Sequence, residues 1–360
     1  MHRLTDNFKN AAIVAVLLIS ACEVGGADTP ADGTTRTWSV RTALTQPESW
    51  LRTDEGRRVA DNVLSFQSSR GSWPKNTNTA AVRFTDDPTR IQGTFDNGAT
   101  TGELRLLARA FTVTQESKYQ AAVLKGIDHI LEAQYPTGGW PQYYPPGKSY
   151  HRHITYNDDA MRRLMEFLRD VATAKDLVFV DAARRQSAQA AFDRGVTCIV
   201  KCQIKVNGKL TVWCAQHDEV TLEPRPARTF ELVSLSGAES AGLLQLLMSL
   251  EKPSPEVVRA VHFGARWFES SKLNGIRQTV VDRDKKIVTD PQAPPLWARF
   301  YEIESNRPIF SGRDSVKKYA LAEIESERRN GYAWYGSWGN AIAERYANWK
   351  QKWPENPPGK

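Results

Sequence analysis

Two aspartates occupy matching places in the chain, each beside an asparagine and shortly before an alanine. Asp96 opens residues 96–99 (Asp-Asn-Gly-Ala), and Asp158 lies within residues 157–160 (Asn-Asp-Asp-Ala). Their carboxylates could hold a hard divalent cation, or could supply an acid and base pair together with Glu239. Aspartate also caps helix N-termini, so capping is the structural alternative for both positions. The residues alone leave these roles open.

The basic residues indicate an acidic partner. The chain has 48 Lys and Arg against 41 Asp and Glu, a formal charge of +7, which would attract polyanions over long range. The cations are scattered, and no helix-turn-helix, RRM or Cys/His finger is recognisable. We therefore expect no nucleic-acid partner. The 11 Trp and 11 Tyr suit either a sugar-binding surface or a packed core.

The N-terminus predicts export. An n-region with Arg3 and Lys9 precedes an apolar run over residues 11–19 that is too short to span a bilayer, so residues 1–21 are predicted to be a signal peptide. Residues 19–22 (Ile-Ser-Ala-Cys) resemble a bacterial lipobox and predict lipidation of Cys22. A plain signal peptide with an incidental Cys22 is the alternative. We expect a lipoprotein of the bacterial cell envelope, at the outer membrane, periplasm or cell surface, or a secreted protein.

Residues 22–37 are rich in Gly, Thr, Asp and Pro and predict a flexible tether. Only the lipid anchor is expected to touch a membrane. Cys198, Cys202 and Cys214 remain after export in a compartment that permits disulfides. Buried free thiols are the favoured interpretation, a pair involving Cys214 is conceivable, and no zinc site is expected.

A helical repeat of roughly seventy residues would position the two aspartates. Each unit has an amphipathic helix, then a glutamine, a glycine, an aromatic residue and a polar loop, and then a second helix. The first helices are predicted around Val59, Val63 and Phe66, around Val123, Ile127 and Ile130, and around Phe192, Val196 and Ile199. The second helices are predicted around Leu104 and Leu107, around Leu164 and Leu168, and around Leu243 and Leu247, with a partial fourth unit from Val257.

Stacked helical hairpins of this kind predict one catalytic domain over residues 38–360, with an all-α fold. Closing the hairpins into a ring would give an (α/α) toroid with long irregular loops and few short strands. The loops and the second-helix N-termini would then share one face. Asp96, Asp158 and the aromatics of the Gly-Trp-Pro segments would meet there. The spacing supports the hairpins and does not itself establish ring closure.

Several motifs, in order along the domain, resemble family ten of the polysaccharide lyases. They lie at residues 138–145, 153–161, 213–219, 227–232, 234–237, 300–303 and 312–314. Several independent motifs are far more specific than any single one. The resemblance implies an α/α toroid, pectate lyase activity on polygalacturonate or pectin, and dependence on Ca²⁺. We expect a monomer.

The resemblance also implies site residues. Asp96 and Asp158 match the calcium ligands of the family, Arg228 matches its catalytic base, and Arg313 its substrate-binding arginine. Asn97, Arg307 and Lys209 are further candidates for substrate contacts, because cations and amides suit the carboxylates of a polyuronate. Elimination from a galacturonate needs its carboxylate neutralised, a base at C5 and stabilised departure of O4.

The base is the chemically difficult element, because arginine is normally protonated far above neutrality. Nearby cations would favour its neutral form. A permanent cationic clamp is the competing role for Arg228, and Arg225 is a second candidate base that could instead be an exposed loop cation. Two alternatives remain for the whole protein. One is a glycoside hydrolase using Asp96, Asp158 and Glu239, and the other is a non-catalytic, pectin-binding surface lipoprotein.

Overall fold

The computed structural model describes residues 37–173 and 175–355, and the chain from Trp38 forms one compact unit. Cys22 and the predicted signal peptide lie outside the described residues, as does nearly all of the tether. The α-helices are α1 Val40–Leu44, α2 Asp54–Ser65, α3 Thr101–Thr114, α4 Ser117–Glu132, α5 Ala160–Ala172, α6 Ala182–Cys202, α7 Gly237–Met248, α8 Pro255–Ser270, α9 Ser326–Asn330 and α10 Trp338–Lys352. Within the described segments, none of these helices combines the length and the apolar character needed to cross a bilayer.

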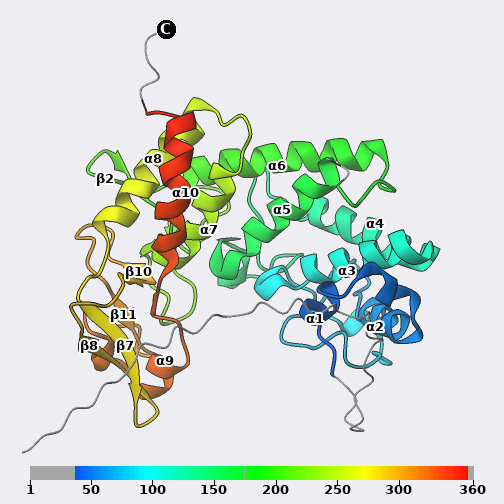
Figure 1. Ribbon diagram of the computed structural model, residues 1–360, viewed down its shortest axis with the longest axis horizontal. Helices are drawn as coiled ribbons and strands as arrows, with labels where there is room; N and C mark the ends of the chain where they lie inside the picture. Colours follow the sequence, from blue (N-terminus) through cyan, green and yellow to red (C-terminus); the bar gives the residue numbers. More distant parts are fainter. Residues whose placement is uncertain (1–36, 174, 356–360) are drawn as a thin grey trace, which may run out of the picture. The chain divides into compact units, whose positions relative to one another are not determined.

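The predicted succession of helices is present, but the main pairs differ from the predicted hairpins, because the second helix of each unit packs on the first helix of the next. Helices α3 and α4, α5 and α6, and α7 and α8 pack as pairs, and α4, α6 and α8 follow one another along the array (Figure 1). One glutamine links each unit to the next. Gln67 Nε2 donates to the carbonyl of Ala122 in α4, and Gln134 Nε2 donates to that of Ala191 in α6, at 2.8 Å in both cases. Gln203 repeats the contact with α8. The repeated glutamine therefore bonds buried helix carbonyls.

The prediction of an all-α toroid is wrong. Thirteen strands form six small sheets among the described residues. They are β1 Ile154–Thr155, β2 Lys205–Val206, β3 Lys209–Leu210, β4 Gln216–His217, β5 Pro224–Arg225, β6 Leu235–Ser236, β7 Ile276–Val281, β8 Asp284–Thr289, β9 Trp297–Ala298, β10 Phe300–Tyr301, β11 Phe310–Ser311, β12 Lys317–Lys318 and β13 Tyr335–Gly336. Most of these strands have only two residues, so they are too short to show the alternation of apolar and polar residues that predicts a strand.

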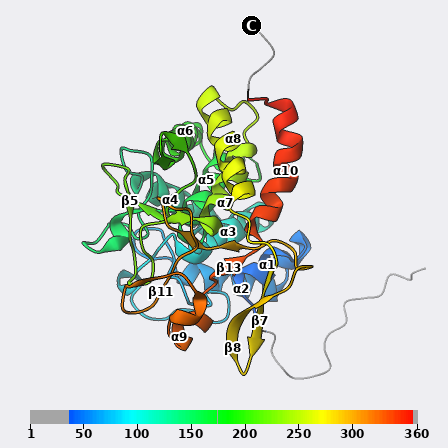
Figure 2. The same ribbon diagram turned by 90° about the vertical axis from the view of Figure 1, so that its left-hand side faces the viewer.

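The strands explain why a ring of hairpins was the wrong expectation. After α8 the chain does not continue with a paired helix but forms the β7–β8 ribbon and the short strands β9 to β13 (Figure 2). Helix packing runs from α1 and α2 through the central pairs to α8 and α10, and Figure 1 shows the two ends of this series on opposite sides. The fold is thus a helical array with strands built into its loops.

Antiparallel pairing brings the motif loops together. In the three-stranded sheet β1-β4-β5, Ile154 lies opposite His217, and Gln216 lies opposite Arg225. A second pairing, of β6 with β10, sets Ser236 opposite Phe300. Loops that are far apart in the sequence are therefore fixed side by side near the starts of α5 and α7.

The tryptophans of the repeat belong to the core. Trp73, Trp140 and Trp213 are fully buried, and each indole Nε1 donates to a carbonyl of the preceding helix, at 2.7, 2.9 and 2.7 Å. Burial of a large ring with its N–H satisfied stabilises the hairpin strongly. The expectation that the Gly-Trp-Pro aromatics lie on the functional face with the aspartates is therefore wrong.

Candidate active site

Two short turns place the aspartate motifs against each other. The 3₁₀ turns η3 Asp96–Gly98 and η5 Asn157–Asp159 precede α3 and α5 and are in contact. Asn97 and Asp158 both have left-handed backbones, with φ of 54° and 50°. Such conformations are uncommon outside glycine and concentrate at functional sites. The N-caps of α3 and α5 are Thr100 and Asp159, so neither Asp96 nor Asp158 occupies a helix-cap position.

Asp96 is buried and already engaged. Its Oδ2 accepts a hydrogen bond from Lys75 Nζ at 2.6 Å and one from Gln142 Nε2 at 2.5 Å, while Oδ1 accepts from the backbone N–H of Asn97. Burial lowers the pKa of Lys75, but the hydrogen bond and charge of Asp96 outweigh it and raise that pKa above its ordinary value. The Asp96 carboxylate is therefore neutralised by a neighbouring ammonium.

Asp158 shares a guanidinium with a deeply buried glutamate. Arg299 Nη2 donates to Asp158 Oδ1 at 3.0 Å and also to Glu239 Oε1, and Asn157 Nδ2 donates to Asp158 Oδ2 at 2.8 Å. Burial opposes the charge on Arg299, but Glu239, Tyr332 and Asp158 raise its pKa. Burial raises the pKa of Glu239 despite this partner. Arg299 thus links Asp158 to Glu239.

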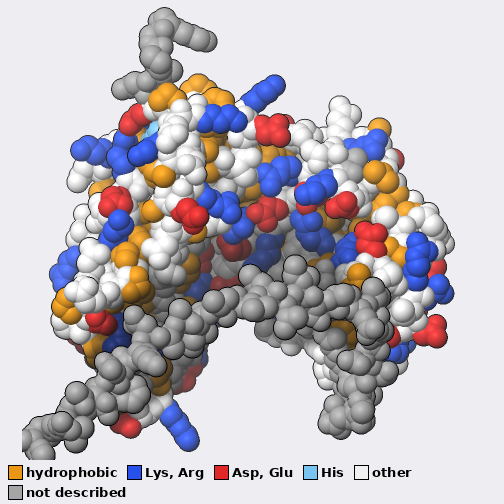
Figure 3. Space-filling view, viewed as in Figure 1, with side chains coloured by type: hydrophobic (Ala, Val, Ile, Leu, Met, Phe, Trp, Pro, Cys, Tyr) orange, Lys and Arg blue, Asp and Glu red, His pale blue; other side chains and the backbone are white. Residues whose placement is uncertain are grey.

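Asp158, Glu239 and Arg299 line a cavity of about 590 Å³. Its wall includes Asn97, Asp158 and Asp159, whose side chains carry oxygen atoms that can bind a cation. Arg162 and Arg163 contribute guanidinium groups. The surface over α5 and α7 shows acidic and basic side chains interspersed (Figure 3). This cavity brings together two of the predicted site residues, Asn97 and Asp158.

Arg228 forms a bidentate pair. Its Nε donates to Glu231 Oε2 at 2.8 Å and its Nη2 to Glu231 Oε1 at 2.6 Å, while Tyr332 Oη donates to the same Oε1 at 2.8 Å. The Glu231 side chain is only 2% exposed, whereas that of Arg228 is 41% exposed. Hydrogen bonding to Glu231 raises the pKa of Arg228, although burial opposes this. The pair therefore strengthens the cationic form.

Two tyrosines, Tyr150 and Tyr332, sense the charge of Arg228. The positive charges of Arg228 and Lys75 both act on Tyr150, whose pKa is nonetheless raised by burial. On the other side, Arg228 lies 5.7 Å from the ring centre of Tyr332, and Arg299 lies 4.6 Å from the same ring. The Tyr332 ring therefore connects Arg228 to Arg299, the partner of Asp158.

The other predicted substrate contacts are spread more widely. Arg313 is exposed, pairs with Glu327 at 3.1 Å and lies 5.9 Å from the ring of Phe230, a ring that also contacts Arg228. Arg307 is exposed with its guanidinium 3.9 Å from the Tyr319 ring centre. Lys209 lines a different cavity beside α8. Of these three, Arg313 is the one that shares an aromatic neighbour with Arg228.

Arg225 pairs with Asp218 at 2.9 Å through a side chain that is 44% exposed. Arg225 is thus an exposed, ion-paired cation, as in its structural alternative, but it lies in strand β5 and not in a loop. The cysteines Cys198, Cys202 and Cys214 are buried free thiols, as favoured from sequence.

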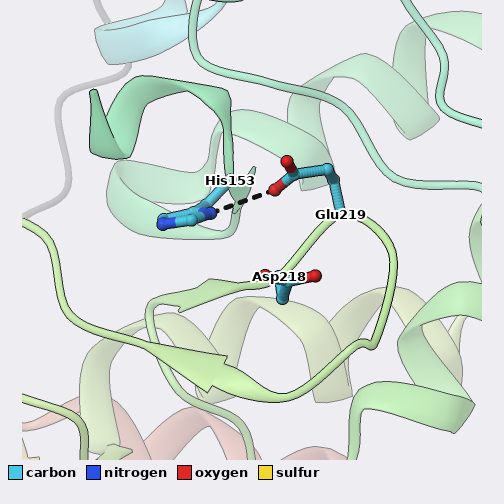
Figure 4. A group of neighbouring side chains, drawn as sticks. All are labelled: His153, Asp218 and Glu219. Atoms are coloured by element: carbon cyan, nitrogen blue, oxygen red, sulfur yellow. Dashed lines mark hydrogen bonds and ion pairs between the residues drawn. The ribbon is translucent and has the colours of Figure 1, made fainter. Parts of the chain in front are cut away.

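His153, Asp218 and Glu219 form a compact group of potential metal ligands beside strand β4 (Figure 4). His153 Nδ1 lies 3.0 Å from Glu219 Oε2. Asp218 Oδ1 accepts two backbone N–H groups, and its Oδ2 pairs with Arg225. Arg152 binds the second oxygen of Glu219. These contacts join the segment of Arg152 and His153 to the segment of Asp218 and Glu219.

Sequence reasoning missed Lys75, Gln142, Glu231 and Arg299 as parts of the site. Gln142 follows the Gly-Trp-Pro segment, and Glu231 lies within the motif at residues 227–232, so the motifs contained a signal for both. Arg299 lies between two strands of two residues each, and its partner Asp158 is 141 positions away in the sequence. No local pattern indicates that contact.

A comparison with protein families adds an independent result. A family model described as pectic acid lyase matches residues 67–343. A search of curated proteins found no match.

Two solved structures are similar over most of the chain. The family 10 polysaccharide lyase from Cellvibrio cellulosa is 35% identical with a TM-score of 0.75, covering 88% of this chain and 95% of that one. An aspartate-to-alanine mutant of a family 10 polysaccharide lyase from the same organism, in complex with trigalacturonic acid, is 34% identical with a TM-score of 0.74. That match covers 89% of this chain and 100% of the other.

These matches support a lyase over the hydrolase and the non-catalytic alternatives. The chain is a polysaccharide lyase and belongs to the pectic acid lyase family, family ten of the polysaccharide lyases.

Proposed function

We propose that this chain is a calcium-dependent pectate lyase. It cleaves α-1,4-linked polygalacturonate by anti-β-elimination and releases 4,5-unsaturated products. One observation carries the proposal: Asn97 and Asp158, on two touching turns with left-handed backbones, line one cavity with arginines around them. The complex of a family relative with trigalacturonic acid supports a polygalacturonate substrate.

The donor set at the cavity fits Ca²⁺. This ion takes carboxylate and amide oxygens in flexible arrangements, and Asp158, Asp159 and Asn97 offer both kinds on one wall. Asp96 belongs to the proposed set but would first exchange its contact with Lys75 for the ion. When bound, Ca²⁺ would neutralise the substrate carboxylate and so acidify the hydrogen on C5.

The reaction itself is an elimination with no added water. A base removes the proton from C5, the C–H electron pair forms the C4=C5 double bond, and the C4–O4 bond breaks. O4 leaves as an oxyanion and takes a proton from solvent or a protein donor. The arginines near the site would hold the carboxylates of the substrate, because planar guanidinium groups bind them through two hydrogen bonds.

Arg228 is the proposed catalytic base. Its partner Glu231 opposes this role, because the pair raises the pKa of the guanidinium. Proton abstraction therefore requires Arg228 to leave Glu231 and to become neutral in a strongly cationic setting at alkaline pH. A permanent clamp on a substrate carboxylate requires neither change and is the competing role for the same residue.

Arg299 is the proposed anchor of Asp158. It is buried, and its hydrogen bond to Asp158 Oδ1 is backed by the buried carboxylate of Glu239. Arg299 fixes Oδ1 of Asp158, Asn157 Nδ2 donates to Oδ2, and the carboxylate stays partly exposed at the cavity wall. Glu239 acts through Arg299 and is a positioning residue.

We also propose that the protein is an exported monomer anchored by lipid at Cys22. The lipobox-like residues 19–22 support this. Metabolic labelling with a radioactive fatty acid should mark the wild type and not Cys22→Ser. Sedimentation of residues 38–360, expressed without the preceding segment, should give a single species of monomer mass.

The product identifies the reaction. Incubation with polygalacturonate should generate an unsaturated uronate that absorbs ultraviolet light in step with new reducing ends. New reducing ends without that absorbance would mean hydrolysis and would overturn the proposal.

A further inference from the structure

A second cavity, of about 270 Å³, lies between three loops close to the Asp96 turn. Two arginines, Arg70 and Arg90, and two tyrosines, Tyr143 and Tyr144, line it, and its remaining polar lining includes Ser68, Ser72, Thr89 and Gln92. We call it the Arg70–Arg90 cavity. Its lining combines guanidinium groups, aromatic rings and hydroxyls, which is the chemistry that binds an acidic sugar.

The guanidinium groups of the two arginines have no polar partner among the described residues. Within residues 37–173 and 175–355, neither Arg70 nor Arg90 makes a side-chain hydrogen bond or an ion pair, and both are exposed. Arg228 and Arg313, in contrast, are paired with Glu231 and Glu327. A ligand carboxylate could therefore bind Arg70 and Arg90 without displacing a protein partner.

Tyr143 connects this cavity to the aspartate site. Its ring lines the Arg70–Arg90 cavity, while Lys75 Nζ lies 5.6 Å from the ring centre and the imidazole of His151 packs edge-on at 5.0 Å. Lys75 in turn binds Asp96. One aromatic ring thus separates the Asp96 turn from the two free arginines.

Close packing and hydrogen bonds fix the walls of the cavity. A Cβ at Gly93 would lie 2.0 Å from Ser72 Oγ, so the two loops approach more closely there than any other residue would allow. Ser72 Oγ and Ser68 Oγ are hydrogen-bonded at 3.0 Å, and Tyr144 Oη donates to Glu132 at 3.1 Å. Such preorganised walls lower the entropy cost of binding.

We propose that the Arg70–Arg90 cavity is a distal subsite that binds the carboxylate of a further uronate residue of the same polysaccharide chain. The proposal rests on the proposed function, because it assumes a polyuronate at the Asp96 and Asp158 turns. The subsite would strengthen binding of long chains and would leave trimers unaffected.

The test compares long and short ligands. Calorimetry in EDTA would measure binding of a long, saturated oligogalacturonate and of trigalacturonate to the wild type, Arg70→Gln and Arg90→Gln. Arg283→Gln is the matched control, because it removes one exposed cation, whose side chain makes no hydrogen bond or ion pair among residues 37–173 and 175–355, from the turn between β7 and β8. Arg90→Lys keeps the charge but loses the two-pronged geometry.

Loss of one charge-assisted carboxylate contact should weaken binding of the long ligand about tenfold in Arg70→Gln and Arg90→Gln, with trimer affinity unchanged. The affinity of Arg90→Lys for the long ligand should lie between those of the wild type and Arg90→Gln. The affinity of Arg283→Gln should match that of the wild type. An equal loss in Arg283→Gln, an equal loss for the trimer, or no loss at all would overturn the subsite. Thermal melting would verify folding. Absence of unsaturated product from the wild type would refute the lyase proposal alone, since binding is measured without turnover.

Discussion

Arg228 and Glu231 form a closed, two-pronged ion pair, with Nε to Oε2 at 2.8 Å and Nη2 to Oε1 at 2.6 Å. The glutamate is almost fully buried and also accepts a hydrogen bond from Tyr332. A buried carboxylate held in this way stabilises the protonated guanidinium. The structure therefore opposes the one chemical change that a base at Arg228 would need.

Glu231→Gln should leave a larger fraction of Arg228 in the neutral form that can act as a base. Removing the carboxylate lowers the pKa of the guanidinium, so the alkaline rise in activity should move to lower pH by about one unit or more. Profiles of kcat/KM against pH would measure this. Glu327→Gln, which frees the exposed Arg313, is the matched control and should leave the profile in place. A profile unchanged in Glu231→Gln would favour the clamp role.

Arg228→Ala should remove cleavage and retain binding of the polymer. General-base catalysis is worth about 10²- to 10⁴-fold, so kcat should fall by at least that range. Affinity electrophoresis in polygalacturonate gels would follow binding separately from turnover. Arg225→Ala, which opens only the exposed pair with Asp218, should keep nearly full activity. Comparable kcat in Arg228→Ala and the wild type would refute the assignment.

Asp158→Asn should weaken calcium binding. Exchanging a carboxylate for an amide removes one negative charge from the ligand set, and the Ca²⁺ concentration for half-maximal activity should rise about tenfold or more. Asp314→Asn alters an exposed aspartate paired with Lys318 and serves as the control. If both variants kept the calcium requirement of the wild type, Asp158 would not be a ligand.

Glu103 should make stability depend on pH. Burial raises the pKa of Glu103 to about 7, and one of its oxygens lacks a hydrogen-bond partner among the described residues. Because the pKa of Glu103 is higher in the folded state, the group stabilises the fold fully at a pH below its pKa in the unfolded chain, near 4.5. This contribution is lost as the pH rises through the folded-state pKa of about 7.

The loss should amount to roughly 3 kcal/mol between pH 4.5 and 8. Glu103→Gln should lose less stability over the same interval, as measured by urea unfolding. Identical pH dependence in the wild type and the variant would contradict the assignment of this effect to Glu103.

The sequence predicted the helices better than their arrangement. Apolar spacing located α2 to α8, because each amphipathic helix carries a local signal. Strands of two residues carry no such signal, and neither does the pairing that sets Ser236 opposite Phe300. The aromatic count could not distinguish a sugar platform from a core, and Trp73 and Trp140 proved to be core residues.

The site was predictable only in part. Matching positions in the repeat drew attention to Asp96 and Asp158, and the turns that carry them do touch. The partners that set their charge, Lys75 and Arg299, come from distant segments and follow from tertiary packing alone. Long-range ion pairs of this kind are invisible to any local pattern.

The most direct test of the account is the ultraviolet absorbance of unsaturated product formed from polygalacturonate at alkaline pH, recorded with Ca²⁺ and with excess EDTA. Calcium-dependent elimination predicts a steady rise in absorbance with Ca²⁺, loss of that rise in EDTA, and recovery when Ca²⁺ is restored. Full and lasting formation of the unsaturated product in excess EDTA would contradict calcium-dependent elimination at the Asp96 and Asp158 turns.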